Sequence, residues 1–314
     1  MKRRVALLQE KGRVILLEDQ VPEPREGEVL IRVRASGICS GDLFAFKGHR
    51  VWFNLPARFG HEPVGEVVKV GPGVTKVRPG DHVVALASEA YSDYLVARQD
   101  RVEVIREEIS FHTALGEPAA CAVNGARVAN PRLGDVVVLV GTGFMGLLLV
   151  QALRGMARIV ALDVDEERLS MARDFGAEVA LNPLRDDVGK EVGELTQGEG
   201  ADIAVESSGN PEALSLAVSC LKRRGRLVIF SYYPRNVEVD MGIWDSKGLE
   251  VLMANPNRAE DMRINLRIAA HMINRGQFRM DRLVTHRWKL EEIQSAFSYA
   301  SEKPKGYLKG VIEP

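Results

Sequence analysis

Short apolar segments separated by turn residues make up about the first 115 residues of the chain. Four of these segments are rich in valine and isoleucine and have the length of β-strands: Val29–Val33, Gly65–Val70, His82–Ala87 and Tyr94–Val96. The sequences Gly71-Pro72-Gly73 and Pro79-Gly80-Asp81 suit tight turns between strands. Short strands with frequent turns predict a small barrel or sandwich rather than a parallel sheet.

The apolar pattern changes near residue 125. Val136–Val140 is apolar at every position, which is typical of a strand buried on both faces. Similar strands alternate with segments of helical periodicity from there on: strands at Arg158–Asp163, Ala201–Glu206 and Arg226–Phe230, and helices at Leu147–Arg154, Glu166–Phe175 and Glu212–Leu221. This alternation predicts a doubly wound parallel sheet over residues 126–261, and the fold class is therefore α/β.

The end of the chain returns to a mixed pattern. We expect a helix near residues 259–275, a strand near Leu283–Arg287, a helix near residues 290–300 and a last strand near Tyr307–Ile312.

Composition narrows the class of protein. The 314 residues suffice for two domains, and 42 basic against 43 acidic residues exclude a strongly basic nucleic-acid-binding protein. The N-terminus has four consecutive apolar residues, too few for a signal peptide, and no apolar stretch is long enough to span a bilayer. We therefore expect no nucleic-acid or membrane partner, and a cytoplasmic protein. Its three cysteines, Cys39, Cys121 and Cys220, exclude a disulfide scaffold and an all-cysteine zinc site.

A glycine-rich turn follows the apolar strand Val136–Val140. Gly141 permits a tight turn, Gly143 lets a pyrophosphate approach the backbone, and Gly146 lets the next helix pack on the strand. The helix N-terminus then offers free N–H groups to the phosphates. The residues of this turn expected to bind a cofactor are Gly141, Gly143, Phe144, Met145 and Gly146.

Asp163 stands at the end of the next predicted strand. A carboxylate there accepts hydrogen bonds from the adenosine ribose and repels a 2′-phosphate, which favours NAD over NADP. Two alternatives are a glycine turn that binds nothing and an adenosylmethionine-dependent methyltransferase. The methyltransferase does not explain the β-rich first hundred residues or so.

Cys39, His61, Glu62 and Glu117 are the candidates for a metal site. A catalytic zinc needs three protein ligands of thiolate, imidazole or carboxylate type and one open position. Each residue alone also has a structural explanation, since a lone cysteine is usually core, a loop histidine is usually on the surface, and a glutamate before proline is often a helix cap. Spacing alone leaves the metal open.

The chain resembles the medium-chain, zinc-dependent alcohol and polyol dehydrogenase family nearly from end to end. The motifs that carry the resemblance are G-I-C-S-G-D (37–42), G-H-E (60–62), G-E-V-V-K-V-G-P-G-V (65–74), P-G-D-H-V (79–83), E-P (117–118), V-G-T-G-F-M-G (140–146) and D-V-D-E-E-R-L (163–169). The resemblance implies a barrel-like (GroES-like) catalytic domain of residues 1–125 and 262–314, and a Rossmann domain of residues 126–261.

The resemblance also assigns metal-site residues. Cys39 and His61 match the first two catalytic zinc ligands, and Glu117 matches the third ligand of the sorbitol dehydrogenase-like branch. Glu62 matches a glutamate near the metal that exchanges with bound water. Asp42 matches the carboxylate that holds the histidine ligand. Cys121 is expected to pack in the core. The alternative is that Cys121 replaces Glu117 as the third zinc ligand.

Two basic residues are assigned to the cofactor in the same way. Arg168 matches a residue that lies against the adenosine, and Lys309 matches a position that faces the pyrophosphate. The implied cofactors are NAD and zinc. Only one zinc ion is expected, because the four-cysteine lobe that binds a structural zinc in many relatives is missing: no cysteine lies between Cys39 and Cys121.

The sequence departs from the family around the proton path. Relatives place a serine or threonine two residues after the zinc-binding cysteine, where this chain has Gly41, with Ser40 one residue earlier as the candidate replacement. Relatives often have histidine where this chain has Phe44, although His49 is nearby. The aromatic residues Phe44, Trp52 and Phe53 either line a substrate pocket or pack in the core, and we favour the core.

The resulting hypothesis is reversible, NAD-dependent and zinc-assisted oxidation of a secondary alcohol to a ketone, on a polyol, sugar or cyclitol. Family likeness implies a homo-oligomer, a dimer or tetramer. The alternatives are a zinc-free quinone or enoyl reductase on the same fold and a non-catalytic dinucleotide-binding protein.

Overall fold

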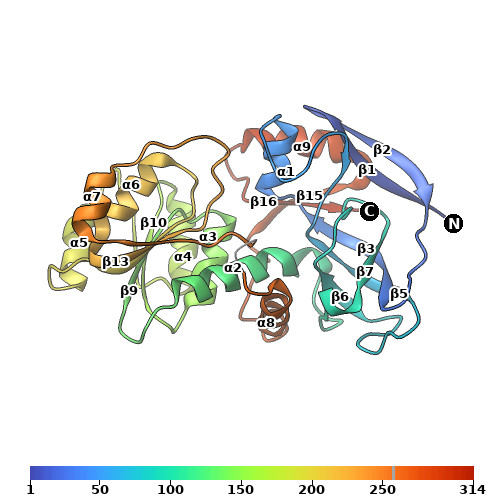
Figure 1. Ribbon diagram of the computed structural model, residues 1–314, viewed down its shortest axis with the longest axis horizontal. Helices are drawn as coiled ribbons and strands as arrows, with labels where there is room; N and C mark the ends of the chain where they lie inside the picture. The colour runs from blue at the N-terminus through green and yellow to red at the C-terminus, as the bar shows by residue number, and fades with distance from the viewer. Residues whose placement is uncertain (257–258) are drawn as a thin grey trace. The chain divides into compact units, whose positions relative to one another are not determined.

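The computed structural model describes residues 1–256 and 259–314, which divide into two compact units (Figure 1). The first unit comprises Met1–Ala120 and Arg263–Pro314, and the second comprises Cys121–Met262. The expected domain boundaries, 125/126 and 261/262, lie close to these divisions. Among the described residues, no helix combines the length and apolar composition needed to cross a bilayer.

The first unit is built on a seven-stranded, mainly antiparallel sheet. Its strand order is β15-β16-β3-β5-β6-β8, and β7 pairs with β3. A second sheet has the order β2-β1-β4. The strands are β1 (Lys2–Glu10), β2 (Arg13–Gln20), β3 (Glu28–Gly37), β4 (Ala57–Arg58), β5 (Pro63–Val70), β6 (His82–Ala85), β7 (Tyr94–Arg98), β8 (Val102–Val104), β15 (Val284–Lys289) and β16 (Lys309–Glu313).

Alternating side chains of β3 explain where this sheet has its core. Val29, Ile31 and Val33 are buried in one cluster with residues of β5, β6 and β7, whereas Arg32 between them is exposed. Leu30 on the opposite face of the strand is buried as well, so part of β3 is covered on both faces. The helices of the unit are α1 (Ser40–Phe46), the start of α2 (Gly116–Ala129), α8 (Met262–Asn274) and α9 (Ile293–Glu302).

The second unit is a six-stranded parallel sheet of order β11-β10-β9-β12-β13-β14. Its strands are β9 (Val136–Val140), β10 (Arg158–Leu162), β11 (Val179–Leu181), β12 (Ala201–Glu206), β13 (Leu221–Ile229) and β14 (Glu250–Met253). Its helices are α3 (Phe144–Leu153), α4 (Glu166–Phe175), α5 (Val188–Leu195), α6 (Pro211–Cys220) and α7 (Met241–Lys247). The expected α/β class, with a GroES-like antiparallel part and a Rossmann-type parallel part, is confirmed.

β9 lies in the middle of the sheet, between β10 and β12. It is apolar at every position because helices cover both faces of the sheet (Figure 1). Val136, Val138 and Val140 share a buried cluster with Leu214 and Val218 of α6, and the intervening residues of β9 are equally buried. The chain builds one half of the sheet outward from β9 to β11 and the other half outward from β12 to β14. The strand order therefore changes direction between β9 and β12. In parallel sheets, ligands bind beyond the carboxyl ends of the strands at this switch point.

A short connection joins β6 to β7, where the resemblance implies that a structural-zinc lobe is missing. Glu89 in this connection has a left-handed backbone (φ 59°) and joins a network of four charged side chains. Arg3 Nη2 lies 2.7 Å from Glu89 Oε2 and 3.5 Å from Asp19 Oδ2. Arg58 lies 2.9 Å from Asp19 and 3.7 Å from Glu89. The network ties the connection to β1, β2 and β4.

Candidate active site

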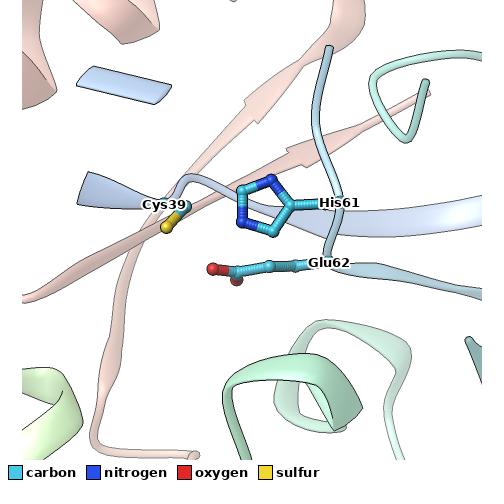
Figure 2. A group of neighbouring side chains, drawn as sticks. All are labelled: Cys39, His61 and Glu62. Carbon is cyan, nitrogen blue, oxygen red and sulfur yellow. The ribbon is translucent and has the colours of Figure 1, made fainter. Parts of the chain in front are cut away.

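Three potential metal ligands meet in the first unit (Figure 2). The ligand atoms of Cys39, His61 and Glu62 all lie within 4.8 Å of one another. Cys39 follows β3, and His61 and Glu62 directly precede β5, which pairs with β3 over seven residue pairs. The pairing of these two strands therefore brings together residues that are separated by 22 positions in the sequence.

Cys39 is the N-cap of α1. Its backbone is extended (φ −80°, ψ 145°), and its Sγ accepts a hydrogen bond from the Gly41 amide at 3.4 Å. This bond fixes the position of the sulfur at the start of the helix. Ser40, the proposed replacement for the relay hydroxyl, begins the helix and is exposed.

Asp42 lies behind the histidine. Its Oδ1 is 3.6 Å from His61 Nδ1 and has no hydrogen-bond partner among the described residues, and the side chain is completely buried. Burial opposes protonation of His61, but the negative charges of Asp42, Cys39 and Glu117 raise the pKa of His61 well above its ordinary value. Burial also raises the pKa of Asp42, against the charge of His61 and a hydrogen bond from Tyr91.

This concentration of negative donors around one imidazole is the chemistry of a cation site. Thiolate, imidazole and carboxylate are the ligand types of zinc, and Nδ1 facing Asp42 leaves Nε2 for a metal. The residues present therefore fit the zinc ion that the sequence implies.

Glu62 is paired with Lys309 of β16. The Nζ of Lys309 lies 2.8 Å from Oε1 and 2.7 Å from Oε2 of the carboxylate, and both residues are buried. The sequence places Lys309 at the cofactor pyrophosphate, but the structure places its ammonium group at Glu62. A role at the pyrophosphate stays a prediction.

Glu117, the other candidate third ligand, is in the first turn of α2. It is not part of the compact group, although its charge acts on His61. Cys121, one turn further along α2, is buried as expected. The structure thus brings Cys39, His61 and Glu62 together, and the role of Glu117 as a ligand stays a prediction.

A cavity of about 480 Å³ is lined by residues 45 and 48–55, and its lining includes none of Cys39, His61 and Glu62. Trp52 lines it, is 59% exposed, and meets the His61 ring edge-on at a centroid distance of 5.5 Å. The expectation that Trp52 packs in the core is therefore wrong. Phe53 is half-buried against the core, and Phe44 meets His49 edge-on.

The glycine turn of the second unit has the geometry that its sequence predicts. Gly141 has φ 97°, and a Cβ on Gly146 would overlap the Gly141 carbonyl and lie 2.9 Å from Ser207 Oγ. Gly143 is the N-cap of α3, and nothing lies within 4 Å of the place where its Cβ would be. Two glycines are thus needed for packing, and the third leaves space for a ligand.

Asp163 is held by the same turn. Its Oδ2 accepts hydrogen bonds from the Thr142 amide (2.7 Å) and hydroxyl (3.0 Å), and its Oδ1 accepts from the Asp165 amide (3.0 Å). An ionised carboxylate has about four acceptor positions, so about one remains for a ribose hydroxyl. Arg168 in α4 has its Nε 3.8 Å from Asp165 Oδ2.

Sequence reasoning missed a buried glutamate at the carboxyl end of β12. Glu206 Oε1 accepts from the Ser208 amide (2.6 Å) and hydroxyl (2.7 Å) and from the Gly209 amide (2.8 Å). Its Oε2 accepts from Tyr233 (2.8 Å) and Ser231. Desolvation and the Glu206 charge raise the pKa of Tyr233. A glutamate followed by Ser-Ser-Gly at the end of a predicted strand was the available signal.

Tyr91 was missed as well. It is completely buried, and its hydroxyl lies 2.8 Å from Asp42 Oδ2 and 3.0 Å from the Gly37 carbonyl. Burial and the Asp42 charge raise the pKa of Tyr91 well above its usual value, so the phenol keeps its proton. No short motif marks this residue, because its partner is 49 positions away.

Comparisons with known proteins identify the family of both parts of the chain. Residues 25–126 match the alcohol dehydrogenase GroES-like domain, and residues 141–269 match the zinc-binding dehydrogenase family. The chain is 26% identical to D-arabitol-phosphate dehydrogenase of Enterococcus avium, covering 90% of this chain and 89% of the relative. It is also 26% identical to sorbitol dehydrogenase of Halalkalibacterium halodurans, with 95% of each chain covered.

A solved structure gives the same result. The chain superposes on 2R,3R-butanediol dehydrogenase from Bacillus subtilis with a TM-score of 0.85 and 26% identity, covering 99% of both chains. The two domain matches together with these relatives support zinc and a nicotinamide cofactor, and an oxidoreductase that acts on a CH–OH group. The chain belongs to the zinc-type, medium-chain alcohol and polyol dehydrogenase family.

Proposed function

We propose that this enzyme catalyses the reversible, NAD-linked oxidation of a secondary alcohol of a polyol, sugar or cyclitol to a ketone, with one zinc ion. The observation that carries the proposal is the compact group of Cys39, His61 and Glu62 in a chain that also has a dinucleotide turn. A zinc-free quinone or enoyl reductase has no use for these three side chains together.

Cys39 and His61 would hold the zinc, with Glu117 as third ligand. When bound, zinc supplies a Lewis acid that favours the alkoxide form of an alcohol. Asp42 orients His61 through Nδ1, and Lys309 balances the charge of Glu62 next to the site. Because Lys309 already neutralises Glu62, we assign the permanent carboxylate ligand to Glu117 and an exchanging role to Glu62.

NAD is the proposed cofactor because Asp163 is an acidic residue fixed beside the open Gly143. A 2′-phosphate on the adenosine ribose would bring two like charges together there, at a cost of the order of 1 kcal/mol or more. Arg168 is proposed to lie against the adenosine.

A phosphorylated polyol is a second candidate substrate, favoured by the cavity lined by residues 45 and 48–55. His49 and Arg50 line this cavity, and residues 43–61 contain no acidic residue but include Lys47 and Arg58. One relative is named as an arabitol-phosphate dehydrogenase. Basic side chains recognise a phosphate by charge-assisted hydrogen bonds.

One screen tests both candidates. Purified protein is assayed for NADH formation with free polyols, sugars and cyclitols and with their phosphates, and its zinc content is measured on the same sample. We expect about one zinc per chain, loss of zinc and activity in His61→Ala, and activity with NAD. Protein without stoichiometric zinc that keeps full activity after chelation would reject the zinc mechanism in favour of a zinc-free reductase. If no substrate leads to NADH formation, the result would favour a non-catalytic dinucleotide-binding protein.

We also propose a homo-oligomer formed through the sheet of the second unit. β14 is an edge strand, and the apolar side chains of Val251 and Met253 on it, with Met241 and Ile243 of α7, are exposed. An exposed apolar edge strand invites pairing with a second chain. Light scattering after gel filtration tests this. We propose a cytoplasmic location, where the thiol ligand Cys39 stays reduced.

A further inference from the structure

We infer that Tyr91 is a positioning residue of the metal site, whose hydroxyl holds Asp42 so that Asp42 can orient His61. The inference rests on the proposed zinc function. Tyr91 has no place among the expected site residues, and it does not touch the three potential ligands of the compact group directly.

The hydroxyl of Tyr91 meets the site on two sides. It is 2.8 Å from Asp42 Oδ2 and 3.0 Å from the carbonyl oxygen of Gly37, two residues before Cys39. Within the described part of the chain, Tyr91 is the one hydrogen-bond donor to the Asp42 side chain. With Oδ2 held by the phenol, the other oxygen, Oδ1, faces His61 Nδ1 at 3.6 Å.

The ring of Tyr91 fixes the segment in front of His61. A Cβ on Gly60 would lie 2.7 Å from Tyr91 Cδ2, and Gly60 has a left-handed backbone (φ 89°). The Gly60 carbonyl accepts a hydrogen bond from the amide of Ala90 at 3.2 Å. Position 60 therefore needs glycine for two reasons, its backbone conformation and the space taken by the tyrosine ring. The ring sets how closely the segment between β4 and β5 can approach.

Tyr91 itself has little freedom to move. Its ring packs on Phe59 and Phe297 at centroid distances of 4.9 Å and 5.5 Å, and its carbonyl accepts from the amide of Ala6. A side chain locked on all sides can hold a neighbour in one orientation. This is the support that a buried carboxylate needs, because an Asp without donors is costly to bury.

The ring and the hydroxyl of Tyr91 can be tested separately. Tyr91→Phe keeps the ring and its packing but removes the one hydrogen bond that the Asp42 side chain accepts from the described residues. Groups that support a metal-binding histidine from outside typically change metal affinity by 10- to 100-fold. Since Tyr91 acts one step further out, we expect an effect of about tenfold.

Zinc affinity is the readout, measured by competition with a chromophoric chelator on the full chain. Tyr91→Phe should bind zinc about tenfold more weakly than wild type. Tyr233→Phe is the matched control: it also removes a phenol hydroxyl that donates to a carboxylate, at 2.8 Å from Glu206 Oε2, but in the second unit and away from Asp42. Its zinc affinity should stay within about twofold of wild type. Equal losses in the two variants would overturn the inference, since they would report general loosening of the core.

A double-mutant cycle tests the path through Asp42. In the Asp42→Ala background the hydroxyl has no carboxylate to hold, so Tyr91→Phe should cause no further loss of zinc affinity. Additive losses would contradict the inference. If Tyr91→Phe yields no folded protein, Asp42→Ala alone still tests the path, because unchanged zinc affinity in that variant overturns it.

Different results would overturn the positioning role and the zinc function. Wild-type affinity in Tyr91→Phe overturns the positioning role alone. Wild-type protein that binds no zinc overturns the proposed function and this inference with it.

Discussion

The indole ring of Trp52 occupies the space that a side chain at Gly41 would need. A Cβ built on Gly41 would lie 2.6 Å from Trp52 Cζ3 and would overlap the neighbouring ring atom. Relatives carry a relay hydroxyl at this position, two residues after the zinc-binding cysteine. The glycine and the tryptophan are thus one structural feature, since a serine at position 41 would have to displace the ring.

Gly41→Ser should displace Trp52, which can move because its ring is largely exposed. Gly41→Ala is the control, because it adds the same Cβ without the hydroxyl. Both variants should change tryptophan fluorescence alike. If a hydroxyl at this position passes on the substrate proton, Gly41→Ser should oxidise alcohol at least about tenfold faster than Gly41→Ala. Equal rates would show that the proton leaves by another route.

Lys309→Met should strongly destabilise the first unit. The substitution leaves the carboxylate of Glu62 buried without its cation, which typically costs about 3–5 kcal/mol of unfolding free energy. The double variant Glu62→Gln with Lys309→Met should recover most of that loss. Urea denaturation of protein without zinc measures both.

The control for this pair is Lys289→Met. Lys289 lies 3.7 Å from Glu313 on the surface, and such a pair contributes under about 1 kcal/mol. A loss in Lys309→Met as small as that of Lys289→Met would mean that Glu62 finds another partner or takes up a proton.

Asp163→Ala should relax the choice of cofactor. The ratio of kcat/KM for NAD to that for NADP should fall by about tenfold or more, because the charge that repels the 2′-phosphate is gone. Asp165→Ala is the matched control, since this neighbouring carboxylate caps α4 through the amides of Glu167 and Arg168. It should lower stability without changing the ratio. An unchanged ratio in Asp163→Ala would refute the assigned role.

Glu206→Ala should weaken NADH binding. The variant leaves the Ser208 and Gly209 amides without their acceptor beside Gly141, whose Cβ position is 2.8 Å from the Ser208 amide. Each buried donor left unpaired costs about 1–3 kcal/mol, so we expect a dissociation constant at least about tenfold higher by fluorescence titration. Asp202→Ala changes the amino end of the same strand and should bind NADH like wild type. Equal affinities in both variants would remove Glu206 from the cofactor site.

The parallel sheet could be predicted from the sequence because it is buried on both faces. β9 is apolar at every position, so its burial and type follow from five residues, and Gly141 and Gly146 follow from the packing of one turn. Spacing alone left the metal open, and resemblance predicted Cys39 and His61 as ligands, Glu117 as the third ligand and Glu62 near the metal. The structure groups Cys39 and His61 with Glu62 instead.

The supporting contacts of the site depend on tertiary structure. Lys309 and Glu62 are 247 positions apart, and no local pattern tells whether the lysine turns toward a cofactor or toward the glutamate. Trp52 looks like a core residue by hydrophobicity, yet it covers His61 from the surface. Such outcomes depend on which strands the sheets of the first unit place side by side.

The connection between β6 and β7 is held by Arg3, Asp19, Arg58 and Glu89. The chain itself supplies these charges, and we expect them to hold the connection in place without a bound ion. We therefore expect newly made protein to fold before it meets zinc, with the ion arriving last at a finished site. Zinc scarcity would then leave a reservoir of folded apoenzyme that becomes active on resupply.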